Sequence, residues 1–138
     1  MPPHVAAKIV SREDLLARVA LARAHGQRLV QCHGCFDIVH PGHIRHLRQA
    51  KSLGTMLLVS LTGDSSITKG LGRPLIPEEL RAENLASLDF VDLVYVEHDP
   101  TAVDLLNAVR PHVYVKGKEY ETNTDPRFLA TLENCHVE

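Results

Sequence analysis

The architecture of this chain can be inferred from one segment, Leu29-Val30-Gln31-Cys32-His33-Gly34-Cys35-Phe36-Asp37-Ile38-Val39-His40-Pro41-Gly42-His43-Ile44-Arg45-His46-Leu47. It contains an apolar run that ends in glycine, a short turn, and a helix that opens with Pro-Gly between two histidines. If the helix begins at Pro41, His40 is its N-cap and His43 its third residue, so both imidazole rings lie at one helix end. That end offers unpaired amides and a partial positive charge, and Gly42 has no side chain to keep an anion away. The segment therefore predicts a strand, loop and helix unit that holds phosphates.

Length and composition limit the class of protein. The 138 residues, of which 44% are apolar, suffice for one domain with a single core. Fifteen basic and seventeen acidic residues give a net charge of -2 without a Lys/Arg cluster, which argues against a nucleic-acid partner. The sequence has no apolar run of eighteen residues and no charged-then-apolar leader, so we expect a cytoplasmic protein with no membrane partner. The three cysteines, Cys32, Cys35 and Cys135, are an odd number and argue against a disulfide framework.

Helix and strand patterns alternate along the chain. Ser11 is an N-cap serine with an acid, Asp14, three residues on, and it opens an amphipathic helix that Gly26 stops. Strands are predicted over residues 28–33, 56–61, 91–96 and 112–115, and further helices over 41–53, from 77, over 101–109 and over 126–132. The alternation predicts the α/β class: a Rossmann-like three-layer sandwich with a parallel sheet. We expect a single domain over residues 1–138, whose first 26 residues form an N-terminal helical segment.

This topology brings three loops to one edge of the sheet. Residues 33–43, 62–73 and 116–124 each follow a predicted strand, and the carboxyl ends of parallel strands share one edge. We therefore expect the functional site in the crevice where the strand order reverses.

The residues around the two histidines also resemble a known family. His40-Pro41-Gly42-His43 behind Gly34-Cys35-Phe36-Asp37 is similar to the HxGH signature of the cytidylyltransferase-like nucleotidyltransferases. Further matches lie at Lys8-Ile9-Val10-Ser11, Gly72-Arg73-Pro74 and Val115-Lys116-Gly117. With these, the chain most closely resembles the nucleotidyltransferase domain of ADP-heptose synthases, and next glycerol-3-phosphate cytidylyltransferase, over roughly residues 8 to 128.

The resemblance implies a reaction. In that family the acceptor's phosphate attacks the α-phosphorus of a nucleoside triphosphate and pyrophosphate leaves, a transfer that needs positioning and charge neutralisation. By resemblance His40 and His43 are catalytic and contact the triphosphate, Gly42 lets it approach, and the backbone of Cys35 and Phe36 lines the nucleotide cleft. The alternative is a pair of ordinary surface histidines at a helix start.

Several cations belong to the predicted site. Lys69 and Arg73 lie in the glycine-containing loop after the second strand, where a catalytic lysine and a nucleotide-binding arginine can close over phosphates. The alternative is a flexible basic surface loop. By resemblance Arg81 faces the site from the next helix, and Lys116 and Gly117 lie near the base and ribose. Lys116 and Gly117 also fit a solvated cap and a turn.

Magnesium is the expected cofactor, and no protein metal site is predicted. Asp37 and Asp64 are the acids expected nearest the phosphates, and Mg²⁺ usually takes only one or two carboxylates and keeps several waters. We interpret each aspartate as a helix-capping or loop-turning residue instead.

Two other interpretations involve Cys32. Its spacing to Cys35 is that of a redox pair, but such a pair needs its first cysteine at a helix N-terminus, and the predicted helix begins about six residues after Cys35. The set Cys32, Cys35, His40 and His43 contains zinc ligand types, yet its central spacing is short and strand alternation sends Cys32 away from the histidines. Both are therefore disfavoured.

The sequence departs from the family pattern in two places. Family members continue after the last helix with a further strand and a Ser/Thr-rich motif that holds triphosphate oxygens, and residues 134–138 show neither. We therefore expect part of the phosphate site to be missing or replaced. His33 stands where relatives often have asparagine.

The predicted function is transfer of a nucleoside monophosphate from a triphosphate, with ATP favoured, to a sugar or polyol phosphate such as heptose 1-phosphate, by a protein expected to be a homodimer. One alternative is a CTP-dependent enzyme acting on glycerol 3-phosphate. Another is an inactive nucleotide-binding or dimerisation module.

Overall fold

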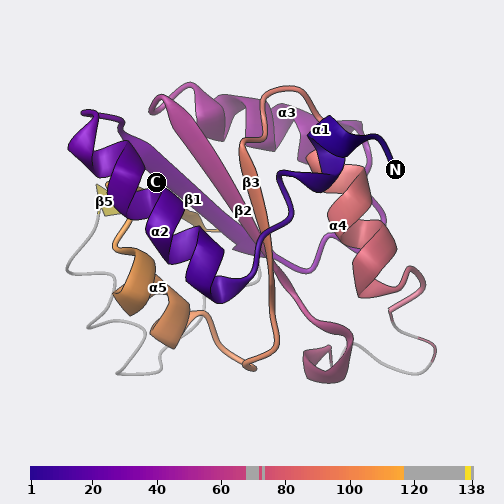
Figure 1. Cartoon of the computed structure of the whole chain (residues 1–138). Coiled ribbons are helices and arrows are strands. Elements are labelled where there is room, and N and C mark those ends of the chain that lie inside the picture. The colour runs from indigo at the N-terminus through magenta and orange to yellow at the C-terminus, as the bar shows by residue number, and fades with distance from the viewer. Residues whose placement is uncertain (68–71, 73, 117–135, 138) are drawn as a thin grey trace.

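The centre of the molecule is a five-stranded sheet with the order β3-β2-β1-β4-β5 (Figure 1). The computed structural model describes residues 1–67, 72, 74–116 and 136–137. The strands are β1 (Leu29–Gly34), β2 (Met56–Thr62), β3 (Leu93–Glu97), β4 (Val113–Lys116) and β5 (His136–Val137). Every neighbouring pair is parallel, and β1 lies between β2 and β4. The strand order therefore reverses between β1 and β4, as predicted for the edge that carries the site.

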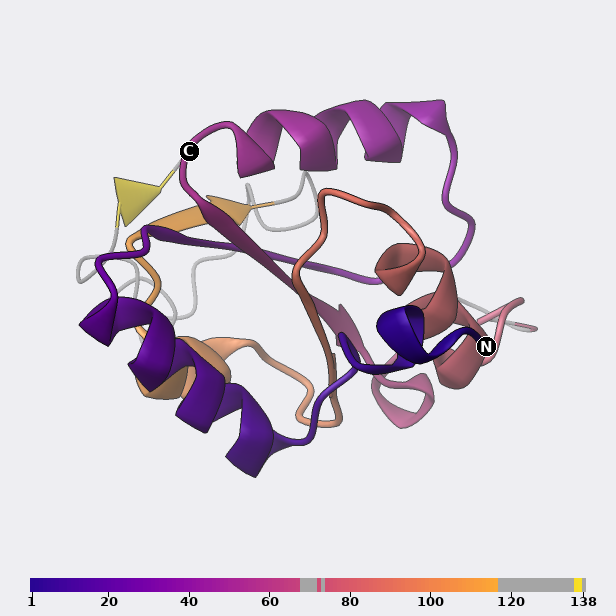
Figure 2. The same ribbon diagram turned by 45° about the horizontal axis from the view of Figure 1, so that its top comes forward.

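Helices cover both faces of the sheet (Figure 2). They are α1 (Pro3–Ala6), α2 (Arg12–Ala24), α3 (Pro41–Lys51), α4 (Glu78–Ala86) and α5 (Val103–Val109), with a 3-10 turn η1 at Asp64–Ser66. The helices α1, α3 and α4 pack on one face, and α2 and α5 on the other. The predicted α/β three-layer sandwich, in a single domain, is confirmed.

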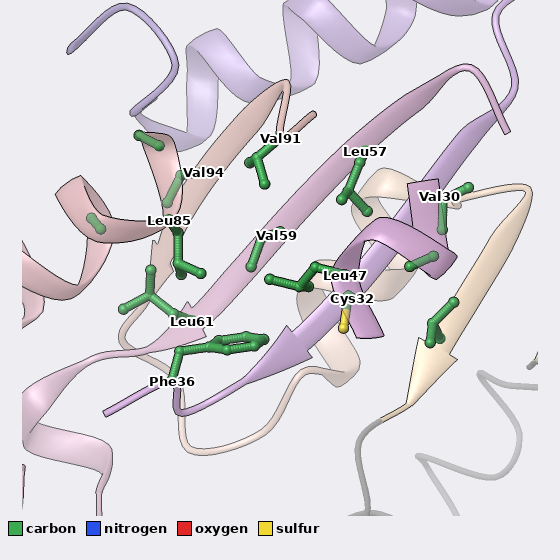
Figure 3. Close-up of a cluster of buried hydrophobic side chains, with 14 of the residues drawn as sticks. Val30, Cys32, Phe36, Leu47, Leu57, Val59, Leu61, Leu85, Val91 and Val94 are labelled. Carbon is green, nitrogen blue, oxygen red and sulfur yellow. The ribbon is translucent and has the colours of Figure 1, made fainter. Parts of the chain in front are cut away.

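Alternation along the strands decides which helix each side chain meets. In β1, Leu29 packs against the α2 side, whereas Val30 and Cys32 pack into the cluster beneath α3 and α4. Leu47 of α3 and Leu85 of α4 lie in that cluster (Figure 3). Residues 57–61 of β2 are all buried, which explains why that strand is a nearly continuous apolar run.

The N-terminal segment is only partly helical. Ser11 caps α2 as predicted, its hydroxyl oxygen accepting from the Asp14 amide at 3.2 Å. Before it, however, the chain is extended: the Val10 amide donates to the Val94 carbonyl at 3.0 Å, and the Val94 amide donates to Lys8 at 2.8 Å. This short bridge covers the outer edge of β3, which would otherwise expose unpaired backbone groups. The expectation of a helical segment over residues 1–26 is corrected accordingly.

The C-terminal end of the described chain differs from expectation. His136–Val137 form β5 and pair in parallel with β4, Val113 opposite His136 and Tyr114 opposite Val137. The prediction that no further strand follows is therefore wrong. The helix predicted over residues 126–132 lies outside the described residues. Within the described part of the chain, no helix is long and apolar enough to cross a membrane.

Candidate functional site

The helix α3 begins with two histidines that cap it together. Its N-cap is His40, whose Nδ1 accepts from the Gly42 amide at 3.0 Å. The His43 Nδ1 in turn accepts from the His40 amide at 3.3 Å. The two ring centroids are 4.0 Å apart. This reciprocal capping box satisfies two backbone amides, and it fixes both rings at the amino end of the helix, as the sequence predicted.

These two bonds determine where each imidazole carries its proton. A neutral imidazole has one donor and one acceptor nitrogen, so a ring whose Nδ1 accepts must carry its hydrogen on Nε2. We therefore assign the Nε2–H tautomer to both His40 and His43. Each ring then has an N–H group pointing away from the cap, at a helix end that already favours anions. The arrangement suits the binding of phosphate oxygens.

Gly42 is required by the position of the His40 ring. A Cβ atom at Gly42 would lie 2.7 Å from Cε1 and 3.0 Å from Nδ1 of His40. Any other residue at this position would therefore push the capping ring aside. The need for glycine is steric here, in addition to the open approach for an anion that the sequence suggested.

The turn from β1 into α3 is held in an unusual conformation. Phe36 has a φ of 52°, in the left-handed region that residues with a side chain rarely adopt. Its ring is buried at the end of the cluster that contains Leu47 and Leu61 (Figure 3). The ring also meets His43 edge-on, with centroids 5.8 Å apart. Packing of the Phe36 ring in the core thus holds its strained backbone. The same ring contacts His43, the catalytic candidate.

The buried side chain of Arg81 bonds three separate segments around the site. It is fully buried, and its Nε donates to the Ile76 carbonyl at 2.9 Å. One terminal nitrogen donates to the carbonyls of Cys35 at 2.9 Å and Thr62 at 2.6 Å. The other makes an ion pair with Asp64 at 2.6 Å. A buried guanidinium is tolerated because all three nitrogens have acceptors.

These contacts give Arg81 a positioning role. They tie the turn after β1 to the end of β2 and to the start of α4. The direct nucleotide contact that the resemblance implies for Arg81 stays a prediction.

The two aspartates considered for magnesium are used by the protein itself. The two carboxylate oxygens of Asp37 accept from the amides of Leu75 and Ile76, at 3.0 and 2.9 Å. Asp64 pairs with Arg81, and it also exchanges amide-to-carboxylate hydrogen bonds with Glu78 in both directions. Among the described residues, no group of three or more His, Cys, Asp or Glu could hold a metal ion. Both aspartates therefore shape the loops around the site, the role that the sequence suggested for them.

The cysteine-based alternatives find no support in the described part of the chain. Cys32 is buried beside Leu47 in the apolar cluster (Figure 3). Cys35 is a free thiol. The helix begins at Pro41, well after both. Cys32 therefore belongs to the core and not to a site with the two histidines.

Some predicted site residues cannot be placed. Lys69, Arg73 and Gly117 lie outside the described residues. Lys116 is the last residue of β4, and its Cα is paired with that of His33 in β1. The backbone of Lys116 thus reaches the crevice between β1 and β4, where a ligand is expected in this topology.

A buried polar group near this crevice was not anticipated. The His33 Nδ1 lies 2.7 Å from the Ser60 hydroxyl oxygen, to which the Gln31 amide nitrogen donates at 3.1 Å. Burial lowers the pKa of His33 from its usual 6.5 to about 4, so this imidazole is neutral at physiological pH. Gln31 and His33 are two residues apart and so share one face of β1, but only the strand register shows that Ser60 of β2 meets them.

Comparison with known proteins shows which family this chain resembles. Residues 31–138 match the family described as cytidylyltransferase-like. The bifunctional protein HldE of Pelobacter propionicus is 40% identical over 115 residues, which are 82% of this chain and 24% of that protein. HldE of Methylobacillus flagellatus is 43% identical over 115 residues, with the same coverage. The chain spans about a quarter of the length of these curated relatives.

Two solved structures share the fold. The lipopolysaccharide core biosynthesis protein from Thermoplasma volcanium superposes with a TM-score of 0.67 at 28% identity, covering 81% of this chain and 94% of that one. A pantoate-beta-alanine ligase from Francisella tularensis has a TM-score of 0.62 at 15% identity, covering 94% of this chain and 65% of that one. The second likeness concerns the fold alone.

Proposed function

Because this chain belongs to the cytidylyltransferase-like family and is a nucleotidyltransferase, we propose that it binds a nucleoside triphosphate at the amino end of α3. The donor we favour is ATP and the acceptor a sugar phosphate such as heptose 1-phosphate, with pyrophosphate as the second product. The observation that carries the proposal is the paired capping of α3 by His40 and His43.

The reaction needs charge stabilisation more than a protein nucleophile. An oxygen of the acceptor phosphate attacks the α-phosphorus, and the bond from that phosphorus to the bridging oxygen of pyrophosphate breaks. Negative charge then grows on the departing pyrophosphate. The Nε2–H groups of His40 and His43 donate to its oxygens, and the helix amides add a partial positive charge. Since both rings are fixed by the cap before substrate binds, little reorganisation is needed during the reaction.

The choice of a sugar phosphate rests on the relatives. The HldE proteins are 40% and 43% identical to this chain over 115 residues. The preferred acceptor and nucleotide can be measured directly with a panel of sugar and polyol phosphates, each tested with ATP and with CTP for pyrophosphate release. Activity with CTP and glycerol 3-phosphate would favour the cytidylyltransferase alternative. Nucleotide binding without product under any acceptor would favour an inactive binding module.

Magnesium enters the proposal as a partner of the triphosphate. Because Asp37 and Asp64 accept from loop amides and from Arg81, we propose that Mg²⁺ is held chiefly by oxygens of the nucleotide and of water. A homodimer also stays a prediction, and sedimentation equilibrium tests it.

The experiment for the proposed site replaces His43. We expect His43→Ala to keep the fold and to lower the rate of pyrophosphate release by about 10²- to 10³-fold, the usual effect of removing one preorganised donor. His25→Ala is the matched control, because His25 is exposed and its Nδ1 bonds the Leu21 carbonyl in the last turns of α2, away from α3. A His43→Ala enzyme with wild-type turnover contradicts the assignment.

A further inference from the structure

The two faces of β1 and β2 differ sharply near their carboxyl ends. On the α3 side, Cys32, Val59 and Leu61 are buried and apolar. On the α2 and α5 side, the corresponding positions carry Gln31, His33 and Ser60, which are 0%, 2% and 0% exposed. We call these three residues the Gln31–Ser60–His33 group. Hydrophobic residues would fill such positions without a desolvation cost, so the polar choice calls for an explanation.

The hydrogen bonds in this group assign a tautomer to His33. The Gln31 amide nitrogen can only donate, so the Ser60 hydroxyl oxygen accepts from it. The single hydroxyl hydrogen of Ser60 then goes to the His33 Nδ1, 2.7 Å away, since the described residues give it no other acceptor. With Nδ1 as acceptor, the proton of neutral His33 lies on Nε2.

His33 lies at the end of β1, three residues before Phe36 in the strained turn of the site. Its Cα is paired with Ser60 in β2 on one side and with Lys116 in β4 on the other, at the gap where the strand order reverses. The next residues along the chain, Gly34 to Phe36, lead into α3. Arg81 holds this turn through the Cys35 carbonyl from the α4 side. The Gln31–Ser60–His33 group lies on the opposite side of the sheet.

We propose that His33, held by Ser60 and Gln31 as the Nε2–H tautomer, is a positioning residue that fixes the end of β1 and so sets the affinity of the nucleotide site. The residue acts through the turn at Cys35 and Phe36 and not by touching the substrate, because its side chain is buried. This inference rests on the proposed nucleotide site. It adds a second support, independent of Arg81, for the backbone that lines that site.

The first test is spectroscopic and needs no variant. In wild-type protein labelled with ¹⁵N at histidine, the His33 Nδ1 should show the shift of an unprotonated nitrogen and Nε2 that of a protonated one. A protonated Nδ1 overturns the proposal. This readout does not depend on catalysis, so it stays informative even if the protein releases no pyrophosphate, in which case only the proposed function fails.

The second test separates positioning from mere stability. Ser60→Ala removes the bond that orients His33, and we expect the KM for the nucleotide to rise about tenfold, the equivalent of one hydrogen bond, with a much smaller change in kcat. Ser60→Thr keeps the hydroxyl and should restore both the tautomer and the KM. Ser87→Ala is the matched control, since Ser87 is exposed and its hydroxyl donates to the Glu83 carbonyl at the end of α4.

Two results would contradict the proposal. One is a Ser60→Ala protein that is less stable but has an unchanged KM, because the group would then be structural only. The other is a Ser60→Thr protein that keeps the tautomer but has the KM of Ser60→Ala. If Ser60→Ala does not fold, Gln31→Met provides the comparison: it removes the donor to the Ser60 hydroxyl oxygen, so the His33 Nδ1 can also carry the proton, and we expect a mixture of tautomers and a raised KM for the nucleotide. An unchanged tautomer and an unchanged KM in Gln31→Met would contradict the proposal.

Discussion

His40 and His43 face each other across the first turn of α3, with ring centroids 4.0 Å apart and each Nδ1 bonded to a backbone amide of that turn. The same two bonds thus stabilise the helix and aim both Nε2–H groups outward. Stability and ligand binding are linked at this helix end, and suitable substitutions can separate them.

Replacing His40 by aspartate should separate capping from anion binding. Aspartate is a strong N-cap, and its charge is favourable at the amino end of a helix, so His40→Asp should retain or raise the Tm. The same charge repels a triphosphate, so we expect ATP affinity to fall at least about tenfold. His40→Ala is the comparison, with a loss of about 1 kcal/mol of stability from the missing cap. Tight ATP binding by His40→Asp would contradict a phosphate site here.

Adding a methyl group at Gly42 should damage the site through His40. In an ordinary helix, Gly→Ala stabilises by about 0.5–1 kcal/mol, but here the new Cβ would lie 2.7 Å from the His40 ring. We expect Gly42→Ala to lower both stability and ATP affinity. In the background of His40→Ala the clash disappears, so the same substitution should become neutral or stabilising. Chemical denaturation of the four proteins measures this non-additivity, and additive effects would contradict the steric argument.

Arg81→Leu should mainly lower the stability of the fold. The substitution leaves Asp64 and the carbonyls of Cys35, Thr62 and Ile76 without their buried donor, for which we expect a loss of about 3 kcal/mol in the free energy of unfolding. Arg81→Lys keeps the charge but cannot reproduce the planar set of bonds, and should recover only part of it. Urea unfolding is the measurement. Unchanged stability with lost ATP binding would instead assign Arg81 to direct nucleotide contact.

Stability should depend on pH through His33. Its pKa is about 4 in the folded protein against 6.5 when exposed, so between these values the unfolded chain binds more protons than the folded one. Stability is therefore full above pH 6.5 and falls as the pH drops toward 4, by at most about 3 kcal/mol. Burial also lowers the pKa of His112, which therefore contributes in the same direction both in the wild type and in a His33→Asn variant. His33→Asn should flatten this part of the curve, and identical slopes would contradict the assignment.

The local features of this molecule could be predicted from its sequence. The cap at Ser11, the start of α3 at Pro41 and the buried strand after Met56 depend on neighbouring residues, so composition and spacing were sufficient. The parallel sheet with helices on both faces followed from the alternation of strands and helices together with the preference for right-handed crossovers.

The long-range features of the molecule could not be predicted from the sequence. Arg81 bonds partners up to 46 residues away, and nothing in its local sequence distinguishes a buried clasp from a residue that faces a ligand. The bridge between Ile9 and Val94 and the two-residue strand β5 are too short to leave a periodic pattern. The Gln31–Ser60–His33 group depends on the register between β1 and β2, which becomes known only when the strands are paired.

The central property of the proposed site is the capacity of His40 and His43 to hold a triphosphate. Equilibrium titration of ATP into the wild type and into the double variant His40→Ala/His43→Ala tests this without requiring an acceptor, with circular dichroism to show that the fold is retained. Two hydrogen bonds to a charged ligand correspond to about 3 kcal/mol, so we predict roughly hundredfold weaker binding by the double variant. Equal affinity of the two folded proteins would contradict a nucleotide site at the amino end of α3.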